Sequence, residues 1–292
     1  MPAIMNEPHR PERPDSVRVL PGTSIEILRQ RRPAQPPCEV LFDFDGTLSL
    51  IREGWPDVMV PMMVEILQAT GTDETPEALE QVCRTFVMDL CGKQTIYQMI
   101  RLAEEVKARR GTPQDPFAYK QLYHERLMDR IRHRREALSS GRARPEEMLV
   151  PGSVELLDAL RERDVRLYLA SGTDQEYVDE EARLLGMDAY FGPHVYGAQR
   201  DYKRFSKQAV IDRILSDNRV DGSRLLGFGD GYVEIENVRS VGGLAVGVAS
   251  DEAGRSGRPD PWKRERLIGV GADIIVPDFG DWRPLIDYIW GA

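Results

Sequence analysis

The segment EVLFDFDGTLS, residues 39–49, places two aspartates directly after an apolar run. The apolar residues are typical of a buried strand, and Asp43 and Asp45 stand one residue apart where that strand ends. Carboxylates that meet at one edge of a sheet repel each other and raise each other's pKa unless a cation neutralises them. The Asp45–Gly46 pair also fits an ordinary turn. The segment therefore predicts either an acidic functional site or a solvated turn.

Short apolar runs and helical patterns alternate along much of the chain. The expected strands cover 40–44, 165–170, 224–229, 244–249 and 273–277, and expected helices cover 153–163, 175–186, 206–217 and 282–290. A repeated strand-then-helix order requires a parallel sheet with helices on both faces. Ligands of such α/β sheets bind beyond the carboxyl ends of the strands. We therefore predict an α/β fold with its site at that edge.

One long segment interrupts the alternation. Residues 48–148 contain no convincing strand, but they carry four helical runs, at 56–69, 75–90, 95–110 and 116–138. The pattern predicts an all-helical domain over 49–148, inserted directly after the first strand. The α/β core then comprises 38–48 and 149–292.

The N-terminal part differs in composition from the rest. Residues 1–37 hold eight of the twenty prolines, which disfavours regular helix and indicates an extension. Within it, residues 17–28 alternate on both sides of a Pro-Gly turn. This pattern predicts a short hairpin that covers a sheet edge or a partner.

Composition excludes several classes of function. The formal net charge of −9 and the pI near 5.2 argue against general binding to nucleic acid or to anionic membranes, since both require a basic surface. Cys38, Cys83 and Cys91 form no C-x-x-C pair, so we expect reduced thiols and no zinc site. The first residues lack the apolar core of a signal peptide, and no run reaches the length of a membrane span. We expect a cytoplasmic protein.

Further polar residues follow the later strands. Ser171 ends the second run, Asp230 and Glu234 follow the run at 224–229, and a lysine, Lys203 or Lys207, precedes that run. Carboxylates gathered at one sheet edge call for a divalent cation, and an all-oxygen site of this kind prefers Mg²⁺. The strand ends therefore predict a magnesium site.

Four motifs carry a family resemblance. DFDGT (43–47), LASGT (169–173), SKQAVIDRIL (206–215) and GFGDGYVE (227–234) follow one another in the order found in the haloacid dehalogenase superfamily of phosphohydrolases. The chain resembles that superfamily from Glu39 to about Phe279, and its phosphoglycolate phosphatase-like members in particular. The resemblance implies a Rossmann-like sheet, and the helical insertion stands where many members carry a cap domain.

The resemblance also implies roles for the two opening aspartates. Asp43 would attack phosphorus and form an aspartyl-phosphate. Asp45 would protonate the leaving oxygen and later deprotonate the hydrolytic water. One carboxyl must then be ionised and the other protonated, so environments that separate their pKa values would turn the repulsion into an acid and a base.

The remaining motifs would complete the site. Mg²⁺ would be held by Asp43, the Asp45 main-chain carbonyl and Asp230, with Glu234 in support, although aspartate is usual in the family at the last position. Ser171 would bind the phosphoryl oxygens, and the motif lysine would neutralise charge.

Several of these positions have structural alternatives. Ser171 fits a helix N-cap in SGTDQE, and Asp230 fits a turn residue. For the lysine we favour Lys207, because an apolar helical stripe follows it and Ser206 can cap that helix. Lys203 lies in a more polar loop.

Substrate choice is expected to come from the inserted helices. Arg52 and Trp55 follow the first motif closely, and residues 91–95 place a glycine break before a helical run, where free backbone donors favour an anion. Hinge packing, solvent exposure or simple helix capping are the alternatives. The candidate substrate residues are Arg52, Lys93, Gln94 and Thr95, with Gly46, Thr47 and Gly172 from the motifs.

The leading hypothesis is Mg²⁺-dependent hydrolysis of a small phosphomonoester, of sugar phosphate or phosphoglycolate type, through an aspartyl-phosphate. The alternatives are a phosphomutase of the same superfamily and a binding module for a phosphorylated ligand without turnover. Seven arginines within residues 126–144 leave nucleic-acid end processing as a further class, although a solvated helix face explains them better. The expected partner is a small phosphorylated metabolite, and the oligomeric state stays open.

Overall fold

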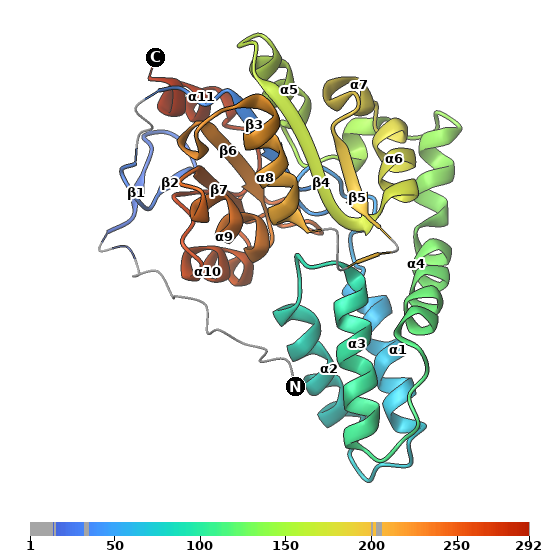
Figure 1. Cartoon of the computed structure of the whole chain (residues 1–292). Coiled ribbons are helices and arrows are strands. Elements are labelled where there is room, and N and C mark those ends of the chain that lie inside the picture. Colours follow the sequence, from blue (N-terminus) through green and yellow to red (C-terminus); the bar gives the residue numbers. More distant parts are fainter. Residues whose placement is uncertain (1–13, 15, 32–34, 200, 203–205, 292) are drawn as a thin grey trace.

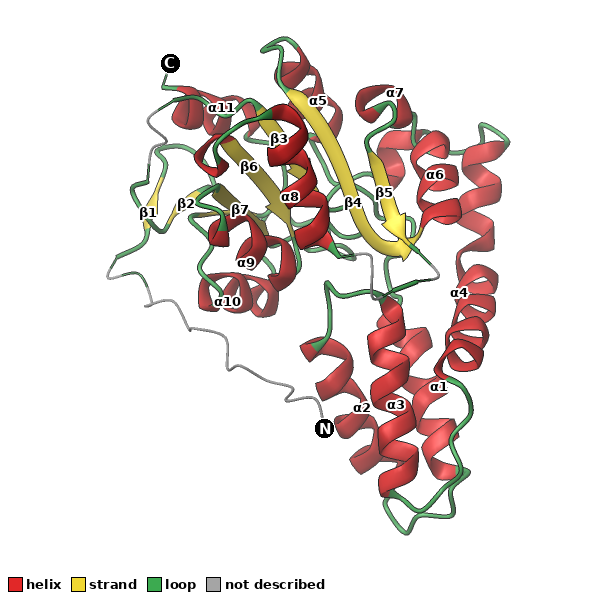
Figure 2. Ribbon diagram, viewed as in Figure 1, coloured by secondary structure: helices red, strands yellow, loops and turns green. Residues whose placement is uncertain are grey.

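Eight strands form one sheet in the computed structural model, which describes residues 14, 16–31, 35–199, 201–202 and 206–291 (Figures 1 and 2). Their order across the sheet is β1-β2-β8-β7-β6-β3-β4-β5, and β8 to β5 run parallel. The mostly parallel sheet confirms the predicted α/β class. The strands are β1 (Arg18–Val19), β2 (Glu26–Ile27), β3 (Glu39–Phe42), β4 (Arg166–Asp174), β5 (Val195–Ala198), β6 (Leu225–Gly229), β7 (Leu244–Val248) and β8 (Ile274–Val276).

Helices cover both faces of the sheet, because alternate residues of each buried strand point to opposite sides. Phe42 of β3 belongs to an apolar cluster with residues of α5 (Ser153–Arg161), α6 (Gln175–Leu184) and α11 (Trp282–Trp290). Its neighbour Leu41 packs in a second cluster with α8 (Lys207–Asn218), α9 (Tyr232–Ser240) and α10 (Pro261–Gly269). The short α7 (Asp188–Phe191) and two 3-10 turns, Pro145–Met148 and Gly222–Arg224, complete this part.

The inserted segment contains α1 (Pro56–Gln68), α2 (Pro76–Asp89), α3 (Thr95–Ala108) and α4 (Pro116–Ser139), all between β3 and β4. Three of the four helices begin with a proline, at Pro56, Pro76 and Pro116, and the Thr75 side chain accepts from Ala78 N–H at the start of α2. Figure 1 shows these helices beyond the arrowheads of the strands, with α4 extending back beside α6. They therefore face the edge at which the functional residues were expected. We call α1–α4 and their loops the cap.

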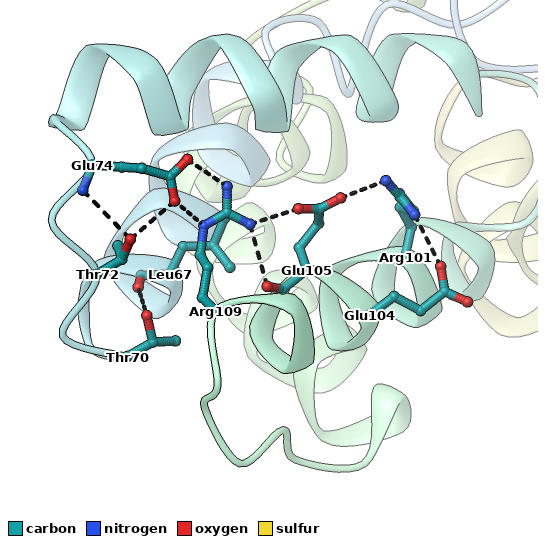
Figure 3. Close-up of polar contacts among 8 residues, drawn as sticks. All are labelled: Leu67, Thr70, Thr72, Glu74, Arg101, Glu104, Glu105 and Arg109. Carbon is teal, nitrogen blue, oxygen red and sulfur yellow. Dashed lines mark hydrogen bonds and ion pairs between the residues drawn. The ribbon is translucent and has the colours of Figure 1, made fainter.

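The far end of the cap is held by an ionic network (Figure 3). The guanidinium of Arg109, in the turn after α3, donates to both carboxylate oxygens of Glu74, at 2.6 and 2.8 Å, and to Glu105 Oε2 at 2.5 Å. Arg101 also pairs with Glu105. Glu74 belongs to the loop between α1 and α2, so the network ties that loop to α3.

The chain before β3 adds two strands to the sheet. β1 and β2 form an antiparallel hairpin, and β2 pairs with β8 in antiparallel register, Glu26 opposite Ile275. The edge of β8 is thus covered, which protects its backbone groups from pairing with another chain. Arg264 of α10 fixes the hairpin through a fork to Glu26, with N–O distances of 2.8 to 2.9 Å.

Two local expectations were incomplete. The pattern analysis missed β5, because the letters VYGA are too short and too small to signal a strand. It also ended the second strand at residue 170, whereas β4 continues through Ser171 to Asp174. Polar residues extend β4 because β5 continues to pair beside them, with Asp174 opposite Ala198.

Phe279 provides a test of the packing on which the return from the cap depends. Its ring centroid lies 5.7 Å from that of Phe228, and its N–H donates to Pro151 O at 2.8 Å. We expect Phe279→Ala to lower the free energy of unfolding by about 3–5 kcal/mol, because it leaves a cavity in the core. Phe117 is 44% exposed, so Phe117→Ala is the matched control and should change it by less than about 0.5 kcal/mol. Urea denaturation compares the two, and equal losses would contradict this packing role.

Candidate active site

The register of β3 with its neighbours brings the polar strand ends together. Phe42, the last residue of β3, stands opposite Leu169 of β4 and Phe228 of β6. Asp43 follows directly, and its N–H donates to Phe228 O at 2.9 Å. Ser171 and Asp230 each lie two residues beyond those partners. Parallel pairing therefore places these three residues at one edge, as expected.

Asp43 is buried and paired with a lysine. Lys207 Nζ lies 2.8 Å from Asp43 Oδ1, and both side chains are less than 10% exposed. Burial raises the pKa of Asp43 to about 6, Lys207 opposes the rise, and the nearby Asp230 charge adds to it. Lys207 also forms an ion pair with Glu234. One ammonium group thus holds two carboxylates.

Asp45 lies in a different environment from Asp43. Its Oδ2 accepts from Thr173 Oγ1 at 2.9 Å and from Ser171 Oγ at 3.3 Å. Arg52 Nε lies 3.7 Å from Oδ1, which has no hydrogen-bond partner among the described residues. Burial raises the pKa of Asp45, and the Arg52 charge opposes that rise. Two hydroxyl groups hydrogen-bond Asp45 and a guanidinium lies 3.7 Å away, whereas an ammonium group contacts Asp43 at 2.8 Å.

Arg52 is itself fixed by a buried carboxylate. Its Nε and Nη2 donate to the two oxygens of Glu181, at 3.0 and 2.8 Å. Glu181 is buried on α6, so this fork ties the first connection to the cap to the sheet domain. A planar fork on a carboxylate fixes orientation as well as distance.

The DFDGT turn supports Asp230. Thr47 Oγ1 accepts from Asp230 N–H at 3.0 Å, and Thr47 is fully buried. Gly46 has a φ of +74°, and a Cβ there would meet Asp230 Oδ2 at 2.3 Å. Only glycine therefore lets the Asp230 carboxylate approach this turn.

The cap loop at residues 91–95 packs against the loops at the strand ends. A Cβ on Gly172 would lie 2.9 Å from Lys93 O, and one on Gly231 would lie 3.0 Å from Gly92 Cα. The loop at 91–95 therefore rests on both strand-end loops, with glycines on each side of the contact. Gln94 Nε2 donates to Tyr202 O at 3.0 Å, which fixes the loop further.

A cavity of about 100 Å³ lies between the cap and the strand ends. This volume is far below the roughly 300–1,000 Å³ of pockets that hold drug-sized ligands. The sheet domain contributes Asp43, Asp45, Ser171, Gly172, Thr173, Lys207, Asp230 and Glu252 to its lining. The cap and its first connection contribute Arg52, Trp55, Met59, Cys91, Gly92, Lys93, Thr95, Gln98 and Tyr123.

The carboxylates around this cavity outnumber their cations. Among the described residues, six carboxylates, of Asp43, Asp45, Glu181, Asp230, Glu234 and Glu252, pair with three cationic side chains, of Arg52, Lys207 and Lys263, and Lys93 adds a fourth cation to the lining. Within the described part of the chain, no group of three or more His, Cys, Asp or Glu side chains forms a ready-made metal site. Instead, Lys207 forms an ion pair with Asp43, and Lys263 forms one with Asp230. The excess negative charge and the all-oxygen donors nevertheless fit a hard divalent cation.

The predicted site residues divide into three groups. Asp43, Asp45, Arg52, Lys93, Thr95, Ser171, Gly172, Lys207 and Asp230 line the cavity. Gly46, Thr47, Gln94 and Glu234 are absent from its lining and instead support neighbouring loops or Lys207. Lys203 lies outside the described residues.

The structure shows which residues cap α6 and α8, the two helices for which the sequence suggested an N-cap. Asp174, not Ser171, precedes α6 as its N-cap, so the capping interpretation of Ser171 is wrong. Ser206 caps α8, accepting from Ala209 N–H at 3.0 Å, and Lys207 begins that helix as expected.

Sequence reasoning missed Thr173, Glu181, Glu252 and Lys263. Thr173 belongs to the LASGT motif, and Glu252 follows the strand at 244–249, so the strand-end rule applied more widely would have found both. Glu181 and Lys263 lie on helices and carry no signal of their own, because only the packing of those helices brings them to the site.

The arginine-rich helix does not face the cavity. Five of the seven arginines pair with carboxylates, Arg126 with Glu65, Arg132 with Asp129, Arg134 with Glu53, Arg135 with Glu180 and Arg144 with Glu147. None of the seven is among the residues that line the cavity. They form a paired surface of α4 and its neighbours, which agrees with the solvated-face interpretation.

The three cysteines are free thiols.

The contact between Gly172 and Lys93 predicts how the cap loop responds to a methyl group. Because Gly172→Ala would place Cβ 2.9 Å from a backbone oxygen, we expect it to displace residues 91–95. Amide hydrogen exchange of this loop, followed by mass spectrometry, should accelerate about tenfold or more. Gly269→Ala is the control, since a Cβ there meets nothing within 4 Å. Unchanged exchange in Gly172→Ala would show that the loop does not rest on this glycine.

Comparison with solved structures supports the fold. A predicted phosphoglycolate phosphatase from Haemophilus somnus is 18% identical, with a TM-score of 0.56 over 86% of this chain and 98% of its own. β-Phosphoglucomutase from Clostridium difficile is 12% identical, with a TM-score of 0.56 over 87% and 97%. A HAD family hydrolase from Deinococcus radiodurans with bound phosphate and sodium is 17% identical, with a TM-score of 0.51 over 86% and 96%.

No curated protein sequence matches the chain significantly. A family model does: that of the haloacid dehalogenase-like hydrolases matches residues 40–242, which is more than half of the chain. Within the described residues, no helix is both long and apolar enough to cross a membrane. The matched span begins at β3 and includes all four motifs, so the chain belongs to the haloacid dehalogenase-like hydrolases and has the fold of a phosphatase of that superfamily.

Proposed function

We propose that the protein hydrolyses a small phosphomonoester in a Mg²⁺-dependent reaction that passes through an aspartyl-phosphate on Asp43. The observation that supports this most is the pair of contrasting carboxyl groups in one cavity between the cap and the strand ends. Asp43 is held by Lys207, and Asp45 is held by two hydroxyl groups. A nucleophile must be ionised and a general acid must carry a proton, and these environments favour that division.

In the first step, an Asp43 carboxylate oxygen attacks phosphorus, and the bond between phosphorus and the ester oxygen breaks. Asp45 gives its proton to the departing oxygen, so the alcohol leaves neutral. In the second step, Asp45 takes a proton from water, which cleaves the acyl phosphate and releases inorganic phosphate. Lys207 holds charge on Asp43 throughout, and Ser171 can donate to a phosphoryl oxygen.

The metal would be held by the Asp43 carboxylate, the Asp45 main-chain carbonyl and the Asp230 carboxylate. When bound, Mg²⁺ supplies electrostatic stabilisation of the charge on the transferred phosphoryl group. Glu234 supports the site through Lys207 in this proposal, because its ion pair with that lysine keeps it out of the cavity lining.

The substrate is proposed to be small and anionic, of sugar phosphate or phosphoglycolate type. The cavity of about 100 Å³ supports a short leaving group rather than a polymer end. Lys93 reaches the cavity from the cap loop, and Trp55 and Tyr123 line it from the cap. A cation and aromatic groups with polar ends suit a phosphorylated acid or a hydroxylated ring.

A phosphomutase is the second candidate, because the same two aspartates serve both reactions and β-phosphoglucomutase from Clostridium difficile has a similar fold. A mutase would return the phosphoryl group to its substrate instead of to water. Measuring inorganic phosphate beside isomer formation separates the two reactions.

A panel of phosphorylated metabolites tests the activity and the metal together. With Mg²⁺ present, we expect phosphate release from small phosphomonoesters and none from phosphorylated oligonucleotides. Addition of EDTA should remove the activity, and excess Mg²⁺ should restore it, because the carboxylates at the site outnumber the cationic side chains among the described residues. Full turnover in the presence of EDTA would rule out the metal role.

The two aspartates should respond differently to removal of charge. Asp43→Asn should lower turnover by at least about 10³-fold, because the nucleophile is lost. Asp45→Asn should be similarly slow overall, but it retains the nucleophile and can accumulate phosphorylated protein. Mass spectrometry of each variant after mixing with substrate measures this difference. Phosphorylation of Asp43→Asn at an equal rate would place the nucleophile elsewhere. Asp174→Asn, outside the cavity lining, is the matched control.

A further inference from the structure

A third cation reaches the acidic cluster from a helix that none of the four motifs includes. Lys263 Nζ lies 2.6 Å from Glu252 Oε1, 2.9 Å from Asp230 Oδ2 and 3.0 Å from Ser250 Oγ. The three partners use all three donors of the ammonium group. The Lys263 side chain is only 12% exposed. Lys263, like Lys207, is therefore a largely buried lysine whose ammonium group pairs with two carboxylates.

The position of Lys263 is fixed by the backbone. Asp260 caps α10 by accepting from Lys263 N–H at 2.8 Å, and Asp260 N–H donates to Ala249 O, also at 2.8 Å. The loop that leaves β7 therefore returns to the end of the same strand before α10 begins. Leu267 and Ile268 bury the other side of the helix. The capped helix start and the packing of α10 therefore hold Lys263 at the strand ends.

The cluster also touches the turn that carries the proposed metal ligands. Ser250 Oγ donates to Gly46 O at 2.5 Å. A Cβ on Gly46 would meet Asp230 Oδ2 at 2.3 Å and Glu252 Oε1 at 3.0 Å. Lys263 therefore holds Asp230 immediately beside the Asp45–Gly46 turn, where the proposed cation would need that carboxylate.

We propose that Lys263 is a positioning residue that competes with the divalent cation for Asp230 and thereby weakens metal binding. It neutralises Asp230 and Glu252 when the metal is absent, and it keeps Glu252 as its partner when the metal takes Asp230. The inference rests on the proposed function, because it assumes that Asp230 is a metal ligand. A lysine that only orients Asp230 would instead strengthen metal binding, and that result would overturn the proposal.

Isothermal titration with Mn²⁺, which prefers the same oxygen donors as Mg²⁺, distinguishes these roles. For Lys263→Met we expect the Kd to fall at least about tenfold, since one positive charge beside the ion is removed. Lys263→Gln removes the charge but keeps hydrogen-bond donors for Asp230 and Glu252, so it is the second variant should the first fail to fold. The same tightening is expected for it.

Lys120→Met is the matched control. Lys120 is also a partly buried, ion-paired lysine, with its Nζ 2.5 Å from Asp174 Oδ1, but it has no contact with Asp230. Its Mn²⁺ affinity should equal that of the unaltered protein. Thermal melting gives a second readout: the metal-free Lys263 variants should melt lower, and they should gain more from added Mn²⁺.

The outcomes separate this inference from the proposed function. Equal or weaker Mn²⁺ binding in both Lys263 variants would overturn the competition. Tight binding in the variants alone would support it in its strongest form. Absence of binding in every protein would overturn the competition and the proposed metal dependence together, whereas binding that Lys263 does not affect would leave the proposed function intact.

Discussion

The parallel pairing of β3 between β4 and β6 is the constraint on which the site depends. Phe42 stands opposite Leu169 and Phe228, so the residues that follow these three positions emerge at one edge. The stacked rings of Phe42 and Phe228, 4.7 Å apart, hold this register from within the core. A slip of one residue would reverse the faces of the strand and separate the carboxylates.

Charge is the second theme of the site. Three cations there each pair with two carboxylates: Lys207 with Asp43 and Glu234, Arg52 with Asp45 and Glu181, and Lys263 with Asp230 and Glu252. Such sharing keeps buried carboxylates close without full neutralisation. The charge that remains favours a divalent cation, and it makes the pocket responsive to small changes in the surrounding cations.

The cap contributes closure as well as lining. Its apolar residues join the same cluster as the sheet residue Phe42, and Arg266 of α10 donates to Met88 O and Asp89 O at the end of α2. The glycine contacts at Gly172 and Gly231 let backbone approach backbone over the cavity. α10 thus contacts both the cap and, through Lys263, the acidic cluster.

The sequence by itself determined the α/β class, the four inserted helices and the residues of the four motifs, because short apolar runs, helical periodicity and Asp-x-Asp-Gly spacing are local signals. It also favoured Lys207, through its N-cap and apolar stripe. Only the tertiary structure showed that Glu181, Glu252 and Lys263 lie at the site. It also showed that β4 extends beside β5 and that Glu234 pairs with Lys207. These features depend on how helices distant in sequence pack together and on which buried charged groups come into contact. Neither produces a periodic pattern in the sequence.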